Sequence, residues 1–159
     1  MRTIEAQIFC DMDGTVVSYH DRFFIIYNIA CCKVGIKPLS RSDWFKCRMA
    51  GIPTYSQEEH NKIQPIFDEL FESKEYLCFD RLIKGMDDVV INLQKKYKVH
   101  IVSFRANDKN LRDQLNGYGI NNINTIIQGF TSTTPVDAKA EMILKAIPNP
   151  SGWILGDTP

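Results

Sequence analysis

The second half of the chain alternates helix-like and strand-like patterns, and this alternation constrains the fold more than any other feature. Apolar residues recur at helical spacing in three segments: 86–96, 107–119 and 136–147. Three short apolar runs predict strands: 98–103, 123–127 and 153–155. Strands that alternate with helices in this way are typical of a parallel sheet. We therefore predict an α/β fold with a parallel sheet.

The first strand lies far from the other strands in the sequence. It is predicted at 7–10, whereas the next strand begins at Lys98. A direct crossover between parallel strands needs far fewer residues. The intervening segment instead has helical patterns: 20–34, 42–50 and 56–72, the last with a Pro65 that predicts a kink or a division. We therefore predict a helical insert at 18–80 and an α/β core formed by 1–17 and 81–159.

Composition excludes several classes of protein. The 159 residues are 44% hydrophobic and 24% charged, which is typical of a globular chain. Nineteen basic residues balance nineteen acidic ones, so no net charge favours nucleic acid or an anionic membrane. The five cysteines contain no C-x-x-C pair, and no apolar stretch is long enough to cross a bilayer. These features favour a soluble, cytoplasmic protein with reduced thiols.

Polar residues follow the predicted strands at the points where the strands end. Asp11, Ser103 and Asp157 each come directly after, or at the end of, an apolar run, and Asp13 follows two residues after Asp11. In open α/β sheets ligands bind at the carboxyl ends of the strands. Two carboxylates so close to a buried strand indicate a metal ion or a shared proton. For Ser103 or Asp157 taken alone, solvation of a loop is an equally good interpretation.

A lysine occupies the apolar face of the last predicted helix. Lys139 shares this face with Met142 and Ile143, which follow it at spacings of three and four residues. One interpretation is that the side chain extends from the first helical turn into solvent. The other is that its ammonium group reaches the carboxylates and neutralises a bound anion.

Four short motifs, in order, resemble those of the haloacid dehalogenase superfamily of aspartate-nucleophile phosphohydrolases. Asp11-Met12-Asp13-Gly14-Thr15 resembles the first motif, Ser103 the second, Lys139 the third, and Gly156-Asp157 the start of the fourth. The insert at 18–80 resembles the all-helical cap of phosphoglycolate phosphatase and β-phosphoglucomutase. The resemblance implies a Rossmann-like core. The acid that usually follows the fourth motif, the fifth strand and the last helix have no counterpart, so the core is expected to be short at its C-terminal end.

The resemblance implies a Mg²⁺-dependent phosphoric monoester hydrolase that acts on a small phosphorylated metabolite. Asp11 would be the nucleophile and Asp13 the general acid and base. Ser103, a loop amide near Phe104, and Lys139 would bind the phosphoryl group. Asp11, the Asp13 carbonyl and Asp157 would hold the metal ion.

Other functions and other residues stay open at this point. A phosphomutase has the same motifs, and a catalytically silent scaffold or regulatory module would be compatible with the short fourth motif. A phosphatase that processes nucleic-acid ends is disfavoured by the balanced charge. Arg105, which follows the second strand, and Lys46 and Arg48 in the insert are candidates for substrate contact. A solvated surface position is the alternative for each of these three residues.

Overall fold

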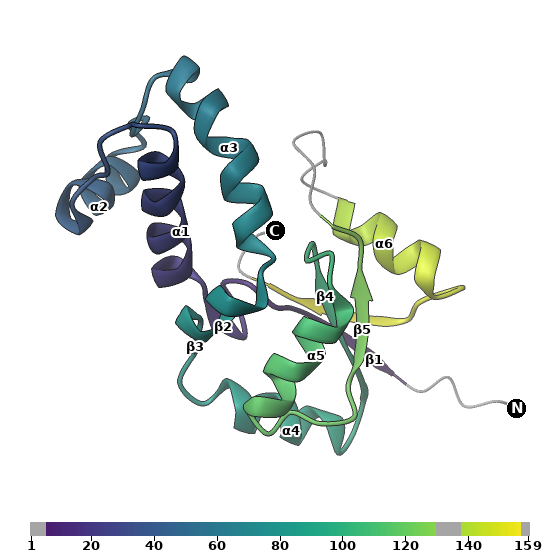
Figure 1. Ribbon diagram of the computed structural model, residues 1–159. Helices are drawn as coiled ribbons and strands as arrows, with labels where there is room; N and C mark the ends of the chain where they lie inside the picture. The colour runs from purple at the N-terminus through teal and green to yellow at the C-terminus, as the bar shows by residue number, and fades with distance from the viewer. Residues whose placement is uncertain (1–5, 130–137, 157–159) are drawn as a thin grey trace, which may run out of the picture. The chain divides into compact units, whose positions relative to one another are not determined.

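The computed structural model describes residues 6–129 and 138–156, and it has the α/β architecture that the sequence predicts (Figure 1). Its strands are β1 (Gln7–Asp11), β2 (Val17–Ser18), β3 (Arg81–Leu82), β4 (Lys98–Ser103), β5 (Asn124–Ile127) and β6 (Gly152–Leu155). Its helices are α1 (His20–Lys33), α2 (Arg41–Ala50), α3 (Gln57–Phe71), α4 (Met86–Gln94), α5 (Asp108–Gly117) and α6 (Ala138–Ala146), with a 3₁₀ helix at Lys74–Phe79. No helix in the described part of the chain combines the length and the apolar character needed to cross a membrane.

The main sheet has four parallel strands in the order β5-β4-β1-β6. Asp11 at the end of β1 is aligned with Val102 of β4, and Ser103 is aligned with Ile127 of β5. The parallel direction brings the carboxyl ends of β1, β4 and β5 to the same edge of the sheet. The polar residues that follow these strands therefore lie on neighbouring strands.

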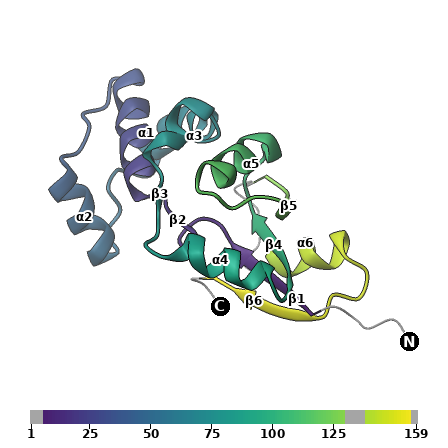
Figure 2. The same ribbon diagram turned by 90° about the horizontal axis from the view of Figure 1, so that it is seen from below.

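Successive side chains of β1 point to opposite faces of the sheet, as the period of a strand requires. Ile8 and Cys10 pack with residues of α4 and α5, whereas Phe9 packs with Met142 and Ile143 of α6. Helices therefore cover both faces, with α4 and α5 on one and α6 on the other (Figure 2). Because Asp11 follows Phe9 by two residues, its side chain is directed to the α6 face.

One edge of the main sheet is formed by apolar residues that remain exposed. In β6 the side chains of Trp153, Ile154 and Leu155 are all classed as exposed, and Trp153 contacts the ring of Tyr97 edge-on. Within the part of the chain that the structure describes, β6 is therefore an exposed apolar edge strand beside the buried strand β1.

The chain divides into two units, Met1–Ser18 with Arg81–Pro159, and Tyr19–Asp80. The first unit contains the parallel sheet and a short antiparallel pair, in which Val17 of β2 is aligned with Leu82 of β3 and Ser18 with Arg81. This pair was not predicted, because two-residue strands have no detectable periodicity.

The second unit is helical, with its own aromatic core. Ile26 and Tyr27 of α1 pack against Ile63 and Phe67 of α3. Ser56 and Glu59 form the predicted capping box at the start of α3. Of the kink or division predicted at Pro65, the division is wrong, because α3 runs as one helix from Gln57 to Phe71.

Candidate active site

Asp11 is the buried last residue of β1 and contacts a lysine from a distant part of the chain. Its carboxylate Oδ2 accepts a hydrogen bond from Nζ of Lys139 in the first turn of α6. The residue is 6% exposed, and the side chain of Lys139 is 24% exposed. Nζ of Lys139 also lies 5.4 Å from the centre of the Phe104 ring. The side chain of Lys139, which lies on the apolar face of α6, therefore ends at the Asp11 carboxylate rather than in bulk solvent.

Burial and this ion pair have opposite effects on the carboxyl group of Asp11. Burial raises the pKa of Asp11, while the hydrogen bond and charge of Lys139, together with a backbone hydrogen bond at Met12, offset part of the rise. Burial raises the pKa of the neighbouring Cys10 thiol to about 12, with a further rise from the charge of Asp11 and a smaller opposing effect from Lys139. At neutral pH, Cys10 is therefore a protonated packing residue.

The loop after β1 turns sharply and directs Asp13 to the other side of the sheet edge. Backbone amides of Val16 and Val17 donate to the carbonyl of Met12, and Gly14 has a φ of 89°, a conformation that favours glycine. The Asp13 carboxylate is held by Arg105, whose Nε donates to Oδ2 at 3.0 Å and whose Nη2 donates to Oδ1 at 2.5 Å. The two aspartates of the motif therefore have different cationic partners.

Ser103 is the buried last residue of β4 and stabilises the turn that follows it. Its Oγ accepts a hydrogen bond of 3.2 Å from the backbone amide of Arg105. Since the hydroxyl accepts here, its own proton can still be donated to another group. Phe104 lies between these two residues and is half-buried. The edge where β1 and β4 end therefore carries a carboxylate, a hydroxyl and an ammonium group.

The donor set for a metal ion at this edge consists of oxygen atoms. Within residues 6–129 and 138–156, no group of three or more His, Cys, Asp or Glu side chains is arranged to hold a metal ion. Asp157, predicted as a ligand, lies outside the described residues. The Asp11 carboxylate and the Asp13 carbonyl are hard oxygen donors, the type that Mg²⁺ prefers together with waters and phosphate. The residues described thus fit a Mg²⁺ ion that has few protein ligands.

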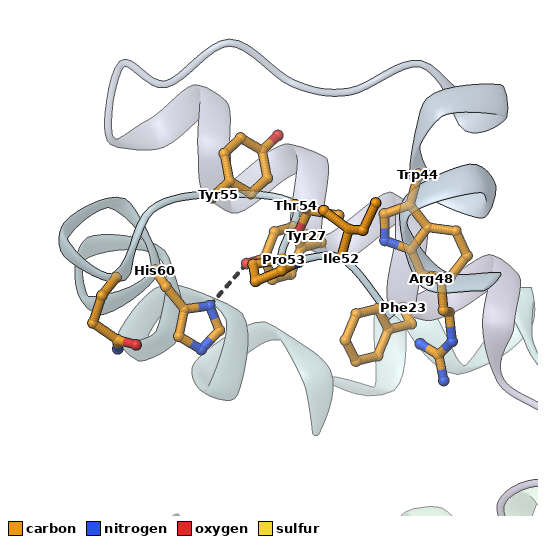
Figure 3. Close-up of a pocket in the computed structure, with 10 residues that line it drawn as sticks. Phe23, Tyr27, Trp44, Arg48, Ile52, Pro53, Thr54, Tyr55 and His60 are labelled. Carbon is orange, nitrogen blue, oxygen red and sulfur yellow. Dashed lines mark hydrogen bonds between the residues drawn. The ribbon is translucent and has the colours of Figure 1, made fainter. Parts of the chain in front are cut away.

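The helical unit contains a cavity of about 360 Å³, and half of the ten residues that line it have aromatic rings (Figure 3). Arg48 lies at this cavity, with its guanidinium 5.5 Å from the Phe23 ring centre and 5.3 Å from that of Trp44. Tyr27 and His60, also in the lining, share a hydrogen bond of 2.9 Å. The arginine is exposed on α2, so it offers a positive charge beside an aromatic surface.

The other basic candidate of the insert is at the surface. The Lys46 side chain is 76% exposed, and its Nζ lies 3.8 Å from a carboxylate oxygen of Asp43. It does not line the cavity that contains Arg48. The structure therefore separates these two predicted substrate residues: one lines a cavity and the other is solvated.

Sequence reasoning did not identify the partner of Arg105. The sequence leaves a solvated loop position and substrate contact both open for Arg105, whereas in the structure the residue is 3% exposed and bound to Asp13. The only signal in the sequence is its position two residues after a predicted buried strand. Gln114 of α5, which contacts the same guanidinium, had no signal at all, because the contact depends on how α5 packs on the sheet.

Comparisons with solved structures identify the fold. A haloacid dehalogenase-like family hydrolase from Streptococcus pneumoniae superposes with a TM-score of 0.70 at 17% identity, covering 97% of this chain and 76% of that one. A predicted phosphoglycolate phosphatase from Haemophilus somnus superposes with a TM-score of 0.60 at 19% identity, covering 92% and 73% of the two chains. The chain therefore has the fold of haloacid dehalogenase superfamily hydrolases, as its motifs predict.

A third neighbour was solved with a metal ion. A hydrolase of the same superfamily from Bacillus subtilis, bound to magnesium, superposes with a TM-score of 0.58 at 16% identity and covers 98% of this chain and 79% of that one. No protein-family model and no curated protein matches the sequence. At these identities the likeness establishes the fold, and the activity has to be argued from the site.

Proposed function

We propose that this chain is a Mg²⁺-dependent phosphatase that hydrolyses a small phosphorylated metabolite through an aspartyl-phosphate intermediate. The observation that supports it is the pairing of buried Asp11, at the carboxyl end of β1, with Lys139 of α6. A carboxylate in this position is partly desolvated and therefore a better nucleophile than one in water. The fold shared with hydrolases and phosphatases agrees with this chemistry.

In the first step an oxygen of Asp11 attacks phosphorus, and the bond from phosphorus to the leaving oxygen breaks. Nucleophile and phosphate are both negative, so their approach requires nearby positive charge. The ammonium group of Lys139 lies at the Asp11 carboxylate and supplies one such charge. The Ser103 hydroxyl and the amide of Phe104 would donate hydrogen bonds to the phosphoryl oxygens.

Asp13 would transfer the protons in both steps. It gives a proton to the leaving alcohol and then takes one from the water that attacks the aspartyl-phosphate. The Asp13 side chain is 25% exposed, so it is accessible to water even though Arg105 holds it. Asp11 and Asp13 thus have separate roles and separate cationic partners.

The Mg²⁺ ion would be held by the Asp11 carboxylate and the Asp13 carbonyl, with Asp157 as the further ligand that the sequence predicts. When bound, the ion supplies positive charge that offsets the charge developing on the phosphoryl group. A Lys and a divalent cation at one carboxylate would together neutralise the anions that meet there. In the helical unit, Arg48 is the better candidate for substrate contact, because it lines a cavity and Lys46 does not.

The test is phosphate release from p-nitrophenyl phosphate and a panel of phosphorylated metabolites, with Mg²⁺ and with a chelator. We expect release that requires Mg²⁺ and that Asp11→Asn lowers to background, because the amide is not a nucleophile. Asp113→Asn, an exposed aspartate on α5, is the matched control and should leave the rate unchanged. Near-normal release by Asp11→Asn would contradict the proposal.

The same panel separates the alternatives that the sequence leaves open. Formation of an isomeric phosphate without release of inorganic phosphate would identify a phosphomutase. Absence of both products for every substrate, with and without Mg²⁺, would favour a catalytically silent module.

A further inference from the structure

Arg105 is a buried cation that contacts both the candidate active site and the helix α5 behind it. It lies two residues after β4, and its side chain is 3% exposed. Arginine is almost never fully buried unless it is paired. Its Nε and Nη2 both donate to the Asp13 carboxylate, one to each oxygen.

The guanidinium is also held from its other side. Its Nη1 donates to Oε1 of Gln114 in α5 at 2.5 Å, and Nε2 of Gln114 donates to the Tyr118 hydroxyl at 3.4 Å. The backbone amide of Arg105 donates to Ser103 Oγ. A chain of hydrogen bonds therefore connects α5 and the end of β4 with the Asp13 carboxylate.

Two parallel hydrogen bonds fix the orientation of a carboxylate, whereas a single hydrogen bond lets it rotate. A carboxylate bound through both oxygens to a planar guanidinium is fixed in its plane and in its rotamer. A lysine provides the same charge without this geometry. A proton donor 1 Å away from its productive position loses much of its effect, so such orientation has kinetic consequences.

We propose that Arg105 is a positioning residue, oriented by Gln114, that fixes the carboxylate of Asp13 for proton transfer to and from the substrate. The inference rests on the proposed function, because it assigns Asp13 the role of general acid. It excludes direct substrate contact as the main role of Arg105, since the two donors that face Asp13 are already engaged by its carboxylate.

The dependence of the reaction rate on the leaving group distinguishes a positioning role from a purely structural one. p-Nitrophenolate departs readily without a proton, whereas phenolate is a poorer leaving group and depends more on the general acid. Loss of positioning should therefore slow phenyl phosphate more than p-nitrophenyl phosphate. The two compounds have similar shapes, so the comparison separates proton transfer from binding.

The experiment measures kcat and KM for both compounds in Arg105→Met, Arg105→Lys and the wild-type chain, after circular dichroism has verified folding. For Arg105→Met we expect kcat/KM for phenyl phosphate, which reports the steps up to departure of the leaving group, to fall about 100-fold, the low end of a general-acid contribution. We expect kcat/KM for p-nitrophenyl phosphate to fall less than about 5-fold, whereas kcat can fall for both compounds because they share the second step. Arg105→Lys should stay impaired in the same pattern. Arg41→Met, at an exposed arginine of α2, is the control and should match the wild type.

Equal losses of kcat/KM on both compounds, no loss of kcat/KM, or full rescue by Arg105→Lys would each overturn the positioning role. If Arg105→Met does not fold, Gln114→Leu replaces it. We then expect a smaller loss of the same pattern, and an equal loss on both compounds would contradict the inference.

Asp13→Asn distinguishes the two proposals. If it shows the leaving-group pattern and Arg105→Met does not, only the positioning role fails. If Asp11→Asn and Asp13→Asn both keep full activity, the proposed function itself fails.

Discussion

At the scale of single residues, His100 is a titratable group that packs in the interior of the sheet. It is 4% exposed in the middle of β4, where its ring stacks on Phe9 at 5.1 Å between centroids. Its Nε2 donates to Oε1 of Gln7 at 2.9 Å. Burial lowers the pKa of His100 below its usual 6.5, and the charge of Lys98 adds to this effect. The folded chain therefore favours the neutral ring.

This pKa shift predicts a loss of stability in acid. The unfolded chain binds a proton at His100 more readily than the folded chain, so the free energy of unfolding falls as the pH drops through 6.5 and on to the folded pKa. Above pH 6.5 the His100 ring is mostly neutral in both the folded and the unfolded chain, so its titration no longer lowers the free energy of unfolding. We expect urea denaturation between pH 7.5 and 5 to show a smaller decline for His100→Gln than for the wild type. Equal declines in the two proteins would contradict the assignment.

At the scale of elements, helix α3 shows that packing can outweigh a local rule. Pro65 removes one hydrogen bond from the helix and usually bends or ends it. Ile63 and Phe67 lie on either side of the proline and are both buried in the core of the helical unit. Interrupting the helix at this point would remove one of them from the core, which explains why the helix continues.

The ends of the helical unit are joined by a buried ion pair. Nε of Arg22 in α1 lies 2.9 Å from a carboxylate oxygen of Asp80, and both side chains are fully buried. Nη1 of Arg22 also donates to the carbonyl of Phe71 at 3.0 Å, and the guanidinium lies 4.0 Å from the centre of the Phe71 ring. The pair thus connects the first turn of the unit with its last residue.

Removing one member of this pair should be far more damaging than removing both. Arg22→Met removes the buried cation that faces the Asp80 carboxylate and should lower the free energy of unfolding by about 3–5 kcal/mol. The double variant Arg22→Met/Asp80→Leu should recover most of that loss, because two apolar residues replace the pair. Arg41→Met, whose ion pair with Asp21 is partly exposed, is the control and should cost less than about 1 kcal/mol. Urea denaturation followed by tryptophan fluorescence measures all three, and an Arg22→Met no less stable than Arg41→Met would contradict the prediction.

At the scale of the whole molecule, the helical unit is inserted between two strands, β2 and β3, that pair with each other. Ser18 and Arg81, which flank the unit, are aligned partners in the antiparallel pair of β2 and β3. The ends of the insertion are therefore held together by the sheet-containing unit itself. Two antiparallel strands in this register can be joined by a two-residue turn.

The geometry predicts that residues 19–80 can be replaced by Asn-Gly without loss of the parallel sheet. The shortened chain should give an α/β circular dichroism spectrum and a cooperative thermal transition, because the buried clusters around β1 and β4 contain no residue of the insert. A second chain with Gly-Ser repeats in place of the turn controls for strain at the junction. Non-cooperative melting of both shortened chains would show that the sheet depends on the helical unit.

The sequence by itself determined where most helices and strands lie and that the sheet is parallel, because hydrophobic periodicity, caps and glycines act over a few neighbouring residues. It also placed polar residues at one edge of the sheet. Helices and strands that alternate imply parallel strands, and the carboxyl ends of parallel strands lie at the same edge. The pairing of Asp11 with Lys139 was one of two open interpretations of the lysine.

Only the tertiary structure decided the strand order, the β2–β3 pair and the partners of Arg105 and Arg22. Each of these contacts joins residues far apart in the chain, such as Asp13 with Arg105, and has no local pattern that could predict it. Buried charges must find partners wherever packing brings oppositely charged groups together. Those partners are chosen by the fold as a whole, and no stretch of neighbouring residues specifies them.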